Sequence, residues 1–483
     1  MALQMTRDDA DSVREFARAL RRQQESMTGH YDFPLIYAST NNTHKRLDHA
    51  SFIENVIVSD SPDRGRGLFA TKDFKAGELI FCEKAFSIAF ASDISEDWYT
   101  IINLNTNRGH EGPHASLFFS LIQQLRRNPK QATRFFDLYD GDYQPKCKAS
   151  AVDGNIVVDT FQTQAIVEHN AFSCAGVKSA DKMVRVKLER EKGPSNSGGI
   201  WLLASRVNHA CDGNARRAFI GDLMVVRAVK DIAEGEEIFM PYSAPGPDNE
   251  GFVTKLHDSW GFWCACAICT AETGTSARQR HERKELLHEM GEFLETHSHC
   301  QEYLPSKSII AKAEQLYQQL EKTYGKAFSM TPSKCISDLR ALYRSSYLYT
   351  NTSSARSTNQ KAPSSSAPIV ARPGLHDLSQ WLAQAYSTPS TPQKSIDWAL
   401  AMLRDLGYLA QVKKNKLSID RRGACPMPAV AHAAMHAAHA YFFRGQIAVG
   451  KQFVEFAMEI WRTFFVALDG FQENFGTTHK QFM

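Results

Sequence analysis

Apolar and polar positions along the chain fall into two textures, helical stripes and short strand-like runs. Apolar residues recur every three or four positions between residues 13 and 20, which predicts an amphipathic helix over residues 8–26. From residue 52 to residue 90 the apolar runs are short and separated by glycines, as in strands joined by tight turns. A helical stripe over residues 117–125 follows, inside a segment (residues 91–150) whose pattern is mainly helical.

The middle of the chain returns to strand texture. A short strand over residues 156–158 is expected to precede a helix that ends near residue 172. The acidic stretch from residue 231 to residue 237 has the composition of a turn. Apolar runs in this part of the chain predict strands over residues 200–203, 223–229 and 238–240.

Beyond residue 269 the pattern is helical. Apolar stripes predict helices over residues 278–297 and 306–325, and a helix pair over residues 429–443 and 447–468. Ser, Thr, Ala and Pro dominate residues 351–373, which predicts a disordered loop. The Ala-rich and aromatic helices of the pair resemble one tetratricopeptide (TPR) unit without the full repeat, so this part is interpreted as an α-helical, TPR-like region.

Composition places the chain among ordinary globular proteins. Its 483 residues exceed one compact core and predict two or three domains. Hydrophobic content of 43% and charged content of 23% are typical of soluble proteins. A formal net charge of +3 is nearly neutral, so no direct nucleic-acid binding is expected. The start of the chain lacks an apolar signal segment and no apolar run reaches the ~18 residues of a membrane span, which predicts an intracellular protein, nuclear or cytosolic, without membrane association.

The cysteines carry the first chemical signal. Cys264, Cys266 and Cys269 form a C-x-C-x-x-C run. A fourth cysteine, Cys211, lies about fifty residues earlier in the chain, directly after His209 and Ala210. Four thiolates close a tetrahedral zinc site, and so tight a run has little other use in a reducing compartment. We therefore predict a structural Zn²⁺ held by these four cysteines, with no position left open for water. The other cysteines are scattered and are interpreted as buried free thiols: Cys82, Cys147, Cys174, Cys300, Cys335 and Cys425.

Motifs around the isolated cysteine carry a family resemblance. Residues 206–215 read R-V-N-H-A-C-D-G-N-A, and the cysteine run follows them. Upstream lie D-R-G-R-G-L-F-A at 63–70 and H-N-A-F at 169–172; downstream, E-G-E-E-I and P-Y-S lie within 234–243. In this order the motifs resemble a SET-domain protein lysine methyltransferase of the SET-and-MYND-like branch with its post-SET zinc segment, over residues 52–270.

The sequence also departs from that branch. Ala210 stands where Ser is usual, Gly213 where Pro is usual, and Trp260 where the branch has Tyr. Residues 87–146 contain no Cys, so the MYND zinc finger is expected to be absent. The change to Trp260 bears on the shape of the channel for the target lysine.

The resemblance implies an α+β fold class: a β-rich SET fold with helical insertions and a post-SET zinc segment, followed by an α-helical TPR-like C-terminal domain. The N-terminal helix would form an extension of its own. The expected boundaries are 1–50 for this extension, 51–245 for the SET domain with an insert at about 91–150, 246–275 for the post-SET zinc segment, and 276–483 for the helical domain with its disordered loop at about 351–373.

The resemblance also implies an activity, S-adenosylmethionine-dependent methyl transfer to a lysine of a histone or another protein. Such an in-line displacement needs a neutral, aligned amine. A tyrosine hydroxyl can orient that amine, which is the catalytic role expected of Tyr242, and Trp260 would wall the lysine channel beside it. Cofactor binding is expected from Arg66, Gly67, Asn170, Ser205, Asn208, His209, Tyr242 and Phe262.

Other interpretations fit some of the same residues. The G-R-G turn around Arg66 alone could be a surface hairpin, and Tyr242 could simply pack. The departures from the branch suit a catalytically silent SET-fold scaffold that uses the helical region for protein–protein interaction. His432, His436 and His439 lie on one face of an Ala-rich helix and are interpreted as a packed face rather than a metal site. A monomer is expected.

Overall fold

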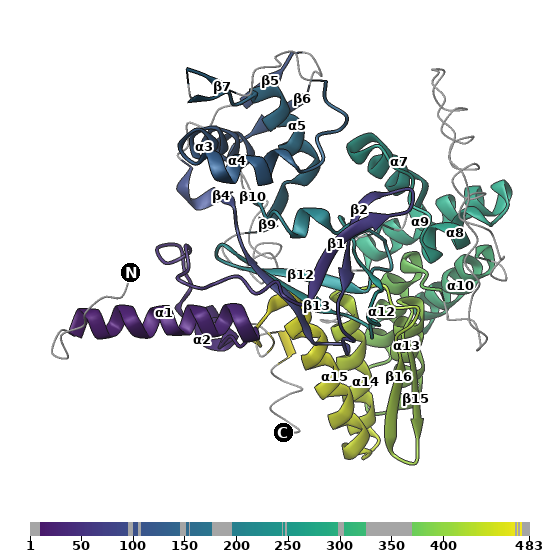
Figure 1. Cartoon of the computed structure of the whole chain (residues 1–483). Helices are drawn as coiled ribbons and strands as arrows, with labels where there is room; N and C mark the ends of the chain where they lie inside the picture. Colours follow the sequence, from purple (N-terminus) through teal and green to yellow (C-terminus); the bar gives the residue numbers. More distant parts are fainter. Residues whose placement is uncertain are drawn as a thin grey trace.

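The computed structural model describes most of the chain. The described residues are 10–94, 100–104, 108–144, 151–153, 155–175, 196–243, 245–246, 249–297, 304–324, 370–468, 471 and 474–475. Figure 1 shows a β-rich centre with a helical insert on one side of it and the C-terminal helices on the other.

The N-terminal helix α1 (Ala10–Thr28) projects from the body of the molecule, and α2 (Phe33–Ser39) follows it (Figure 1). Asp48 ties α1 to the chain that follows through ion pairs with Arg18 at 2.6 Å and Arg21 at 3.0 Å. The helix predicted at the N-terminus is therefore confirmed, with its described part beginning at Ala10.

A four-stranded sheet in the order β1-β2-β14-β11 carries the candidate site. β1 (Val56–Ser61) and β2 (Gly65–Ala70) form an antiparallel hairpin, and Asp63 in its turn takes a left-handed φ of 61°. β14 (Glu237–Met240) pairs antiparallel with β2 and parallel with β11 (Asn208–His209). The sheet thus brings the G-R-G turn, the N-H turn and the strand before the P-Y-S motif side by side.

Two three-stranded sheets complete the β-rich centre. Their apolar faces meet in one core that includes the fully buried side chains of Phe74, Phe81 and Trp201. The strands predicted over residues 223–229 and 238–240 are confirmed. The strands of the two sheets are β3 (Leu79–Lys84), β13 (Leu223–Ala228) and β12 (Ala215–Ile220), then β4 (Ser87–Ala89), β10 (Asn196–Ile200) and β9 (Phe172–Ala175).

The predicted strand over residues 200–203 is wrong beyond its first residue, where β10 ends. The amides of Leu203 and Ala204 donate instead to the carboxylate of Glu83, at 2.8 and 2.9 Å. These bonds start the 3₁₀-helix η2 (Ala204–Arg206), because a side-chain acceptor satisfies N–H groups that a strand would pair with a neighbour.

The helices predicted in and after the insert are present. The stripe over residues 117–125 lies in α3 (Pro113–Arg127) of the insert, and the helix expected to end near residue 172 is α5 (Thr160–Asn170). The strand predicted over residues 156–158 retains only its first residue, and the hairpin β5–β6 was not predicted. The other elements of this part are η1 (Ala91–Asp93), β5 (Thr100–Asn103), β6 (Arg108–Glu111), α4 (Pro129–Phe136), β7 (Ala151–Val152) and β8 (Asn155–Ile156).

After β14 the described chain is mainly helical. The helices predicted over residues 278–297, 306–325, 429–443 and 447–468 are confirmed as α9, α10, α14 and α15. None of the described helices is both long and apolar enough to cross a membrane. The elements are α7 (Asn249–Trp260), α8 (Ala267–Thr273), α9 (Ala277–Thr296), α10 (Lys307–Thr323), η3 (Pro373–Leu375), α12 (His376–Ala385), α13 (Pro392–Asp405), β15 (Leu409–Lys413), β16 (Lys416–Asp420), α14 (Ala429–Phe443) and α15 (Ile447–Phe465).

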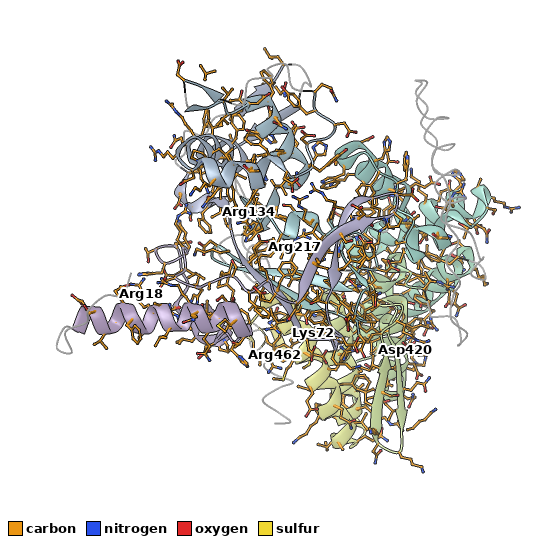
Figure 2. The ribbon with its side chains drawn as sticks, in the orientation of Figure 1. Arg18, Lys72, Arg134, Arg217, Asp420 and Arg462 are labelled. Carbon is orange, nitrogen blue, oxygen red and sulfur yellow. The ribbon has the colours of Figure 1, made fainter. Side chains whose placement is uncertain are left out.

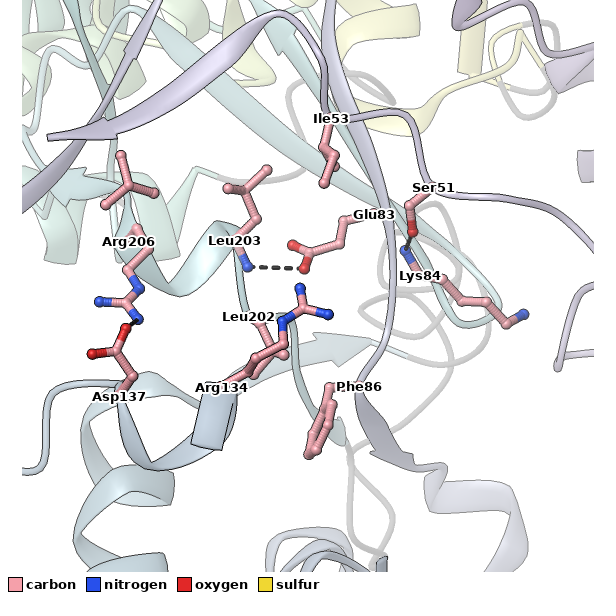
Figure 3. Close-up of a pocket in the computed structure, with 11 residues that line it drawn as sticks. Ser51, Ile53, Glu83, Lys84, Phe86, Arg134, Asp137, Leu202, Leu203 and Arg206 are labelled. Carbon is pink, nitrogen blue, oxygen red and sulfur yellow. Dashed lines mark hydrogen bonds and ion pairs between the residues drawn. The ribbon is translucent and has the colours of Figure 1, made fainter. Parts of the chain in front are cut away.

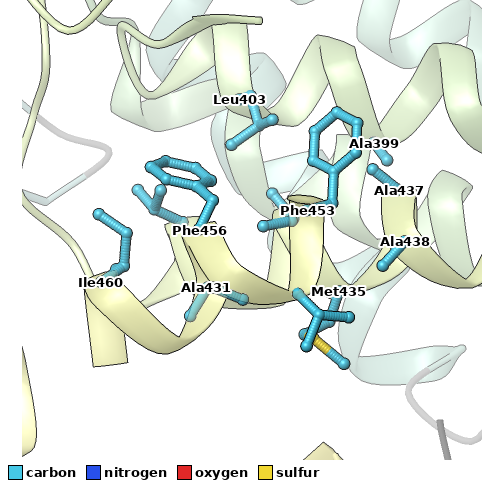
Figure 4. Close-up of a cluster of buried hydrophobic side chains, with 14 of the residues drawn as sticks. Ala399, Leu403, Ala431, Met435, Ala437, Ala438, Phe453, Phe456 and Ile460 are labelled. Carbon is cyan, nitrogen blue, oxygen red and sulfur yellow. The ribbon is translucent and has the colours of Figure 1, made fainter. Parts of the chain in front are cut away.

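The C-terminal helices share one apolar core (Figure 4). Small side chains of α14, such as Ala437 and Ala438, leave room for Phe453 and Phe456 of α15. A Cβ atom at Gly450 would lie 2.4 Å from the ring of Phe442, so only glycine fits this close approach.

A hairpin interrupts the helical region that the sequence predicted. β15 and β16 are joined by Lys414 and Asn415, which take left-handed φ values of 50° and 61°. Two such residues form the tight turn that matches the twist of a hairpin. The pattern missed it because a Lys-Asn pair is a weaker signal for this turn than Asn-Gly.

Most of the predicted disordered loop, residues 351–369, lies outside the described residues. At its C-terminal end, Ala371 is 2% exposed and packs with Val370 in the apolar cluster that contains the four cysteines. The amide of Arg372 donates to the carbonyl of Asp405 at 2.6 Å. The prediction of disorder is therefore wrong for residues 370–373.

The three histidines of α14 are packed side chains. The ring of His432 lies 4.9 Å from Phe475, and that of His439 lies 4.4 Å from Phe443. Burial lowers the pKa of His436 to about 3. This packing agrees with the interpretation of the three as a helix face.

Three of the scattered cysteines fall in the described residues, and all three are buried free thiols, as predicted: Cys82, Cys174 and Cys425. Burial raises the pKa of Cys82 and of Cys174 to about 12, so both stay protonated. The other three lie outside the described residues: Cys147, Cys300 and Cys335.

Candidate functional site

Four buried cysteines meet at the junction of the β-rich centre and the segment after it. Cys211 follows β11, Cys264 and Cys266 lie between α7 and α8, and Cys269 lies in α8. Their sulfur atoms all lie within 4.8 Å of one another. Among the described residues, this is the one group of three or more possible ligands that is close enough to hold a metal ion.

The geometry of this cluster fits zinc. The Sγ atom of Cys211 lies 3.8 Å from that of Cys264 and 3.6 Å from that of Cys269. A tetrahedron with Zn–S bonds of about 2.3 Å has sulfur–sulfur edges of about 3.8 Å, whereas a disulfide would need about 2 Å. The donor set and its spacing therefore suit a closed, structural zinc site.

His209 connects the cysteine cluster to the second part of the site. Its Nδ1 atom accepts the amide hydrogen of Tyr242 at 3.0 Å, so the neutral ring carries its proton on Nε2. The Nε2 atom lies 3.4 Å from the sulfur of Cys211, a distance that allows an N–H···S bond to a metal-bound thiolate. One imidazole thus joins the metal ligand to the tyrosine.

Tyr242 is held at several atoms. Its hydroxyl donates to the carbonyl of Val207 at 3.0 Å, and its amide donates to His209. The ring packs edge-on against Trp260 and Phe262, with centroids 5.3 and 6.0 Å away. Burial raises the pKa of Tyr242 to about 12, so the hydroxyl is protonated at neutral pH and can serve as a donor.

The G-R-G turn lies directly against the N-H turn. The amide of Asn208 donates to the carbonyl of Arg66 at 3.2 Å and to the carboxylate of Glu237 at 2.8 Å. A Cβ atom at Gly67 would lie 2.3 Å from the Glu237 carboxylate and 3.2 Å from the Asn208 amide. A side chain at position 67 would therefore push the Glu237 carboxylate away from the Asn208 amide, so glycine at this position preserves that contact.

Asp137, from the insert, bridges two arginines of the site. Both oxygens of its carboxylate accept from Arg66, at 2.9 and 3.0 Å, and one accepts from Arg206 at 2.5 Å. Burial alone would raise the pKa of Asp137, but the hydrogen bonds from these arginines lower it overall. Arg66, on β2, is thus tied to the insert by the carboxylate and by the backbone carbonyl of Asp137.

Asn170, at the end of α5, and Ser205, in η2, contact each other. The hydroxyl of Ser205 donates to the carbonyl of Trp201 at 2.7 Å and lies 3.4 Å from the carbonyl of Asn170. The amide of Asn170 donates to the carbonyl of Tyr139 at 2.7 Å, which fixes the end of α5 against the insert.

A pocket of about 410 Å³ adjoins this group of residues (Figure 3). Asp137 and Arg206, which bind each other beside Arg66, both line this pocket. None of the residues expected to bind the cofactor lines it. Burial raises the pKa of Glu83, which lines it, to about 7. The full lining is Ser51, Ile53, Val58, Glu83, Lys84, Phe86, Arg134, Asp137, Leu202, Leu203 and Arg206.

Contacts link most of the predicted site residues into two neighbouring groups. One group joins Arg66, Gly67 and Asn208 through backbone and amide contacts, whereas Ser205 and Asn170 form a separate contact. The other group surrounds His209, which touches the rings of Tyr242 and Phe262, and Trp260 touches Tyr242 in turn. The two groups are continuous because Asn208 and His209 are successive residues of β11.

Sequence reasoning missed Asp137, Glu237 and Glu83. Glu237 stands within the E-G-E-E-I motif, so its position at the start of a central strand was a usable signal for an inward carboxylate. Asp137 and Glu83 carry no such signal, because long-range packing alone brings them to the site.

Gly213, one of the departures from the family pattern, has a local reason. A Cβ atom there would lie 2.5 Å from the carbonyl oxygen of Phe239 and 3.2 Å from the Cα of Met240. We expect Gly213→Ala to lower the free energy of unfolding by about 1–3 kcal/mol, because backbone of β14 must shift to admit the methyl group. Thermal denaturation of both proteins measures this, with Gly246→Ala, where a Cβ meets nothing within 4 Å, as the control. An unchanged midpoint for Gly213→Ala would contradict the packing argument.

Comparison with known proteins agrees with this geometry. The SET-domain family model matches residues 65–243, which contain the sheet that carries the site. A Gibberella zeae protein named "Methyltransferase" is 36% identical over 316 residues, which are 64% of this chain and 42% of that protein. Residues 65–243 are therefore similar to a SET domain, in agreement with the motifs in the sequence.

Other similarities cover shorter parts of the chain. The Schizosaccharomyces pombe protein "Histone-lysine N-methyltransferase set5" is 36% identical over 77 residues, 16% of this chain and 24% of that protein. Human "N-lysine methyltransferase SMYD2" is 36% identical over 91 residues, 19% of this chain and 21% of that protein. The chain spans less than half the length of each of these relatives.

Proposed function

We propose that the chain is an S-adenosylmethionine-dependent protein-lysine N-methyltransferase. The observation that carries this proposal is the placement of Tyr242, a protonated phenol held beside the N-H turn of a SET domain and bordered by Trp260 and Phe262. The named activities of the similar proteins support the same chemistry.

The cofactor would be held by the group around the N-H turn. When bound, S-adenosylmethionine supplies an activated methyl group on a sulfonium. The guanidinium of Arg66 is suited to its carboxylate, and the polar groups of Asn170, Ser205 and Asn208 to its amino-acid end. The ring of Phe262, which touches His209, can stack on an adenine.

The target lysine must reach the site as a neutral amine. A free lysine has a pKa of about 10.4, so on the order of one in a thousand is neutral at pH 7. The aromatic walls at Trp260 and Phe262 exclude water, and exclusion of water lowers the pKa of an amine. The hydroxyl of Tyr242 and the carbonyl of Val207 then supply the polar contacts that align it.

The remaining expectations from the sequence enter as parts of this proposal. The four cysteines would hold a structural Zn²⁺ that fixes the post-SET segment. The substrate would be a histone or another protein, and the protein would act inside the cell as a monomer. The TPR-like helical region would form a wall of the substrate cleft, and the MYND finger would be absent.

Cofactor binding gives the direct test. We expect calorimetry to show binding of S-adenosylmethionine to the wild type and a loss of about tenfold or more for Asn208→Ala, because that amide joins the G-R-G turn to Glu237. Asn128→Ala in the insert, an exposed residue before α4, is the matched control and should bind normally. No heat of binding with folded wild-type protein would reject the proposal.

A silent scaffold remains the competing function, and the departures at Ala210, Gly213 and Trp260 motivated it. The structure gives Gly213 a packing reason that is independent of catalysis. Trp260 presents its ring to Tyr242 without displacing the tyrosine hydroxyl from Val207. These two observations favour the enzyme over the scaffold.

A further inference from the structure

Arg217 reaches from one sheet to the backbone of another. It lies on β12, whereas Tyr242 follows β14 in the sheet that carries the site. Its Nη1 atom donates to the carbonyl of Pro241 at 2.9 Å, and its Nη2 atom donates to the carbonyl of Tyr242 at 3.0 Å. A planar guanidinium makes two such bonds from a rigid fork of donors, a geometry that the single nitrogen of a lysine does not reproduce. Figure 2 shows Arg217 in the central part of the molecule.

The charge of Arg217 has carbonyl partners instead of a carboxylate. Among the described residues no Asp or Glu forms an ion pair with it, and its guanidinium lies over the ring of Phe172, 5.1 Å from the centroid. Burial lowers the pKa of Arg217 to about 9. A buried cation is costly, and backbone carbonyls compensate it only in part, so its retention calls for an explanation.

We propose that Arg217 is a positioning residue for methyl transfer: it holds the backbone on both sides of the Pro241–Tyr242 peptide and, at neutral pH, places a positive charge beside the amine that Tyr242 aligns. This inference rests on the proposed function. It adds a residue that lies outside the family motifs found in the sequence.

The first part of the role is mechanical. The amide of Tyr242 is bound to His209, its hydroxyl to Val207 and its carbonyl to Arg217. Three bonds at three separate atoms leave the phenol no freedom to rotate away from the channel. Loss of the carbonyl bonds should therefore lower the rate constant more than the affinity for the cofactor.

The second part is electrostatic. The guanidinium occupies acceptor sites of two carbonyls that could otherwise bind an ammonium, and its charge repels a second cation nearby. Both effects favour the neutral form of the substrate lysine. Removing the charge raises the pKa of the bound amine, so the ascending limb of the activity profile, which reports loss of the amine proton, moves to higher pH.

Other charged or titratable groups near this point are few among the described residues. Arg216 and Cys174 act on Arg217 electrostatically. Arg64 and Glu237 act on Tyr242 in the same way, and His209 binds its amide. All of these groups remain in both Arg217 variants, so a shift of the profile there reports on Arg217 itself.

The experiment compares Arg217→Gln, Arg217→Lys and Arg216→Gln with the wild type. Glutamine removes the charge, and lysine keeps the charge but loses the planar fork. Arg216 is the matched control, because it is the neighbouring part-buried arginine and its guanidinium lies over the ring of Phe464 on α15 instead of at the backbone of Pro241 and Tyr242. Initial rates of methyl transfer from radiolabelled S-adenosylmethionine to core histones and to a desalted cell extract are measured from about pH 6.5 to 10, with cofactor affinity by calorimetry.

For Arg217→Gln we expect turnover at pH 8 to fall by about tenfold or more and the profile to move up by about one pH unit, with cofactor affinity within about twofold. Arg217→Lys should lower turnover without moving the profile, because its charge remains. Arg216→Gln should keep the wild-type profile, whatever it costs in stability.

The outcomes separate the two proposals. An unmoved profile for an active Arg217→Gln protein would overturn the role of the charge, and an equal shift in Arg216→Gln would show a general electrostatic effect instead. A wild type that binds the cofactor and labels neither probe would overturn the proposed function, and the role of Arg217 with it. If Arg217→Gln does not fold, Arg217→Lys decides: wild-type turnover there would contradict the positioning role.

Discussion

Tyr242→Phe is expected to lower the rate of methyl transfer by about 10²-fold or more while leaving affinity for S-adenosylmethionine nearly unchanged. The hydroxyl is the only atom removed, and it donates to the carbonyl of Val207 from inside an aromatic enclosure. An interaction that aligns the amine in the transition state appears in the rate constant rather than in ground-state binding. The measurement is radiolabelled methyl transfer to a cell extract, with cofactor affinity determined in parallel.

The matched control is Tyr31→Phe. That hydroxyl also donates to a backbone carbonyl, of Ala50 at 2.8 Å, but it lies near α1 and α2 and outside the site. Its loss should cost some stability and leave turnover unchanged. Equal labelling by Tyr242→Phe and the wild type would remove Tyr242 from the mechanism. A wild type that binds cofactor but labels nothing across varied extracts would favour the scaffold.

The fold was predictable where local pattern determines structure. The helices α9, α10, α14 and α15 follow apolar stripes of helical period, so their existence and approximate ends could be derived from the sequence. The predictions failed where a tertiary contact replaced the local preference. The strand expected over residues 200–203 gave way to η2 because Glu83, from another strand, accepts the amides of Leu203 and Ala204.

Residues 370–373 are a second case in which a tertiary contact replaced the structure that the local sequence predicted. Its composition continues that of the Ser- and Pro-rich stretch before it, which predicted disorder. Ala371 is nevertheless buried against the apolar cluster of the cysteines, next to Cys425. Composition alone does not indicate that Val370 and Ala371, at the end of this stretch, pack against an apolar cluster formed by distant residues.

In the candidate site, too, the grouping of residues within one sequence motif was predictable and contacts between distant segments were not. Asn208, His209 and Cys211 stand in one motif, so the sequence itself keeps them together, and the imidazole of His209 lies 3.4 Å from the sulfur of Cys211. The distances between sequence-distant partners could not be derived in this way. Asp137 reaches Arg66 from the insert, and Arg217 reaches Tyr242 from a different sheet, and no local pattern marks either pair.

Removal of the metal is expected to have the second large effect. Elemental analysis should find about one zinc per chain, because four buried thiols lie at the spacing of a tetrahedral site. Cys269→Ser, or treatment with a strong chelator, should loosen the segment from Trp260 to Cys269 and lower cofactor affinity by about 10- to 100-fold. Zinc content, calorimetry and protease sensitivity of that segment measure the three parts of this prediction.

The size of the effect follows from how the cluster is connected. Cys211 follows the N-H turn directly, and its sulfur lies 3.4 Å from the imidazole that also accepts the amide of Tyr242. Phe262, which contacts that imidazole, precedes Cys264. Without metal, four thiols must share one buried space, and the aromatic wall they anchor loses its fixed end. The matched control is Cys174→Ser, a buried free thiol on β9 outside the cluster, which should keep zinc and cofactor affinity even if stability falls. Zinc-free protein that retained full cofactor affinity would show that the cysteine cluster and the cofactor residues are independent, and would contradict the connection through His209.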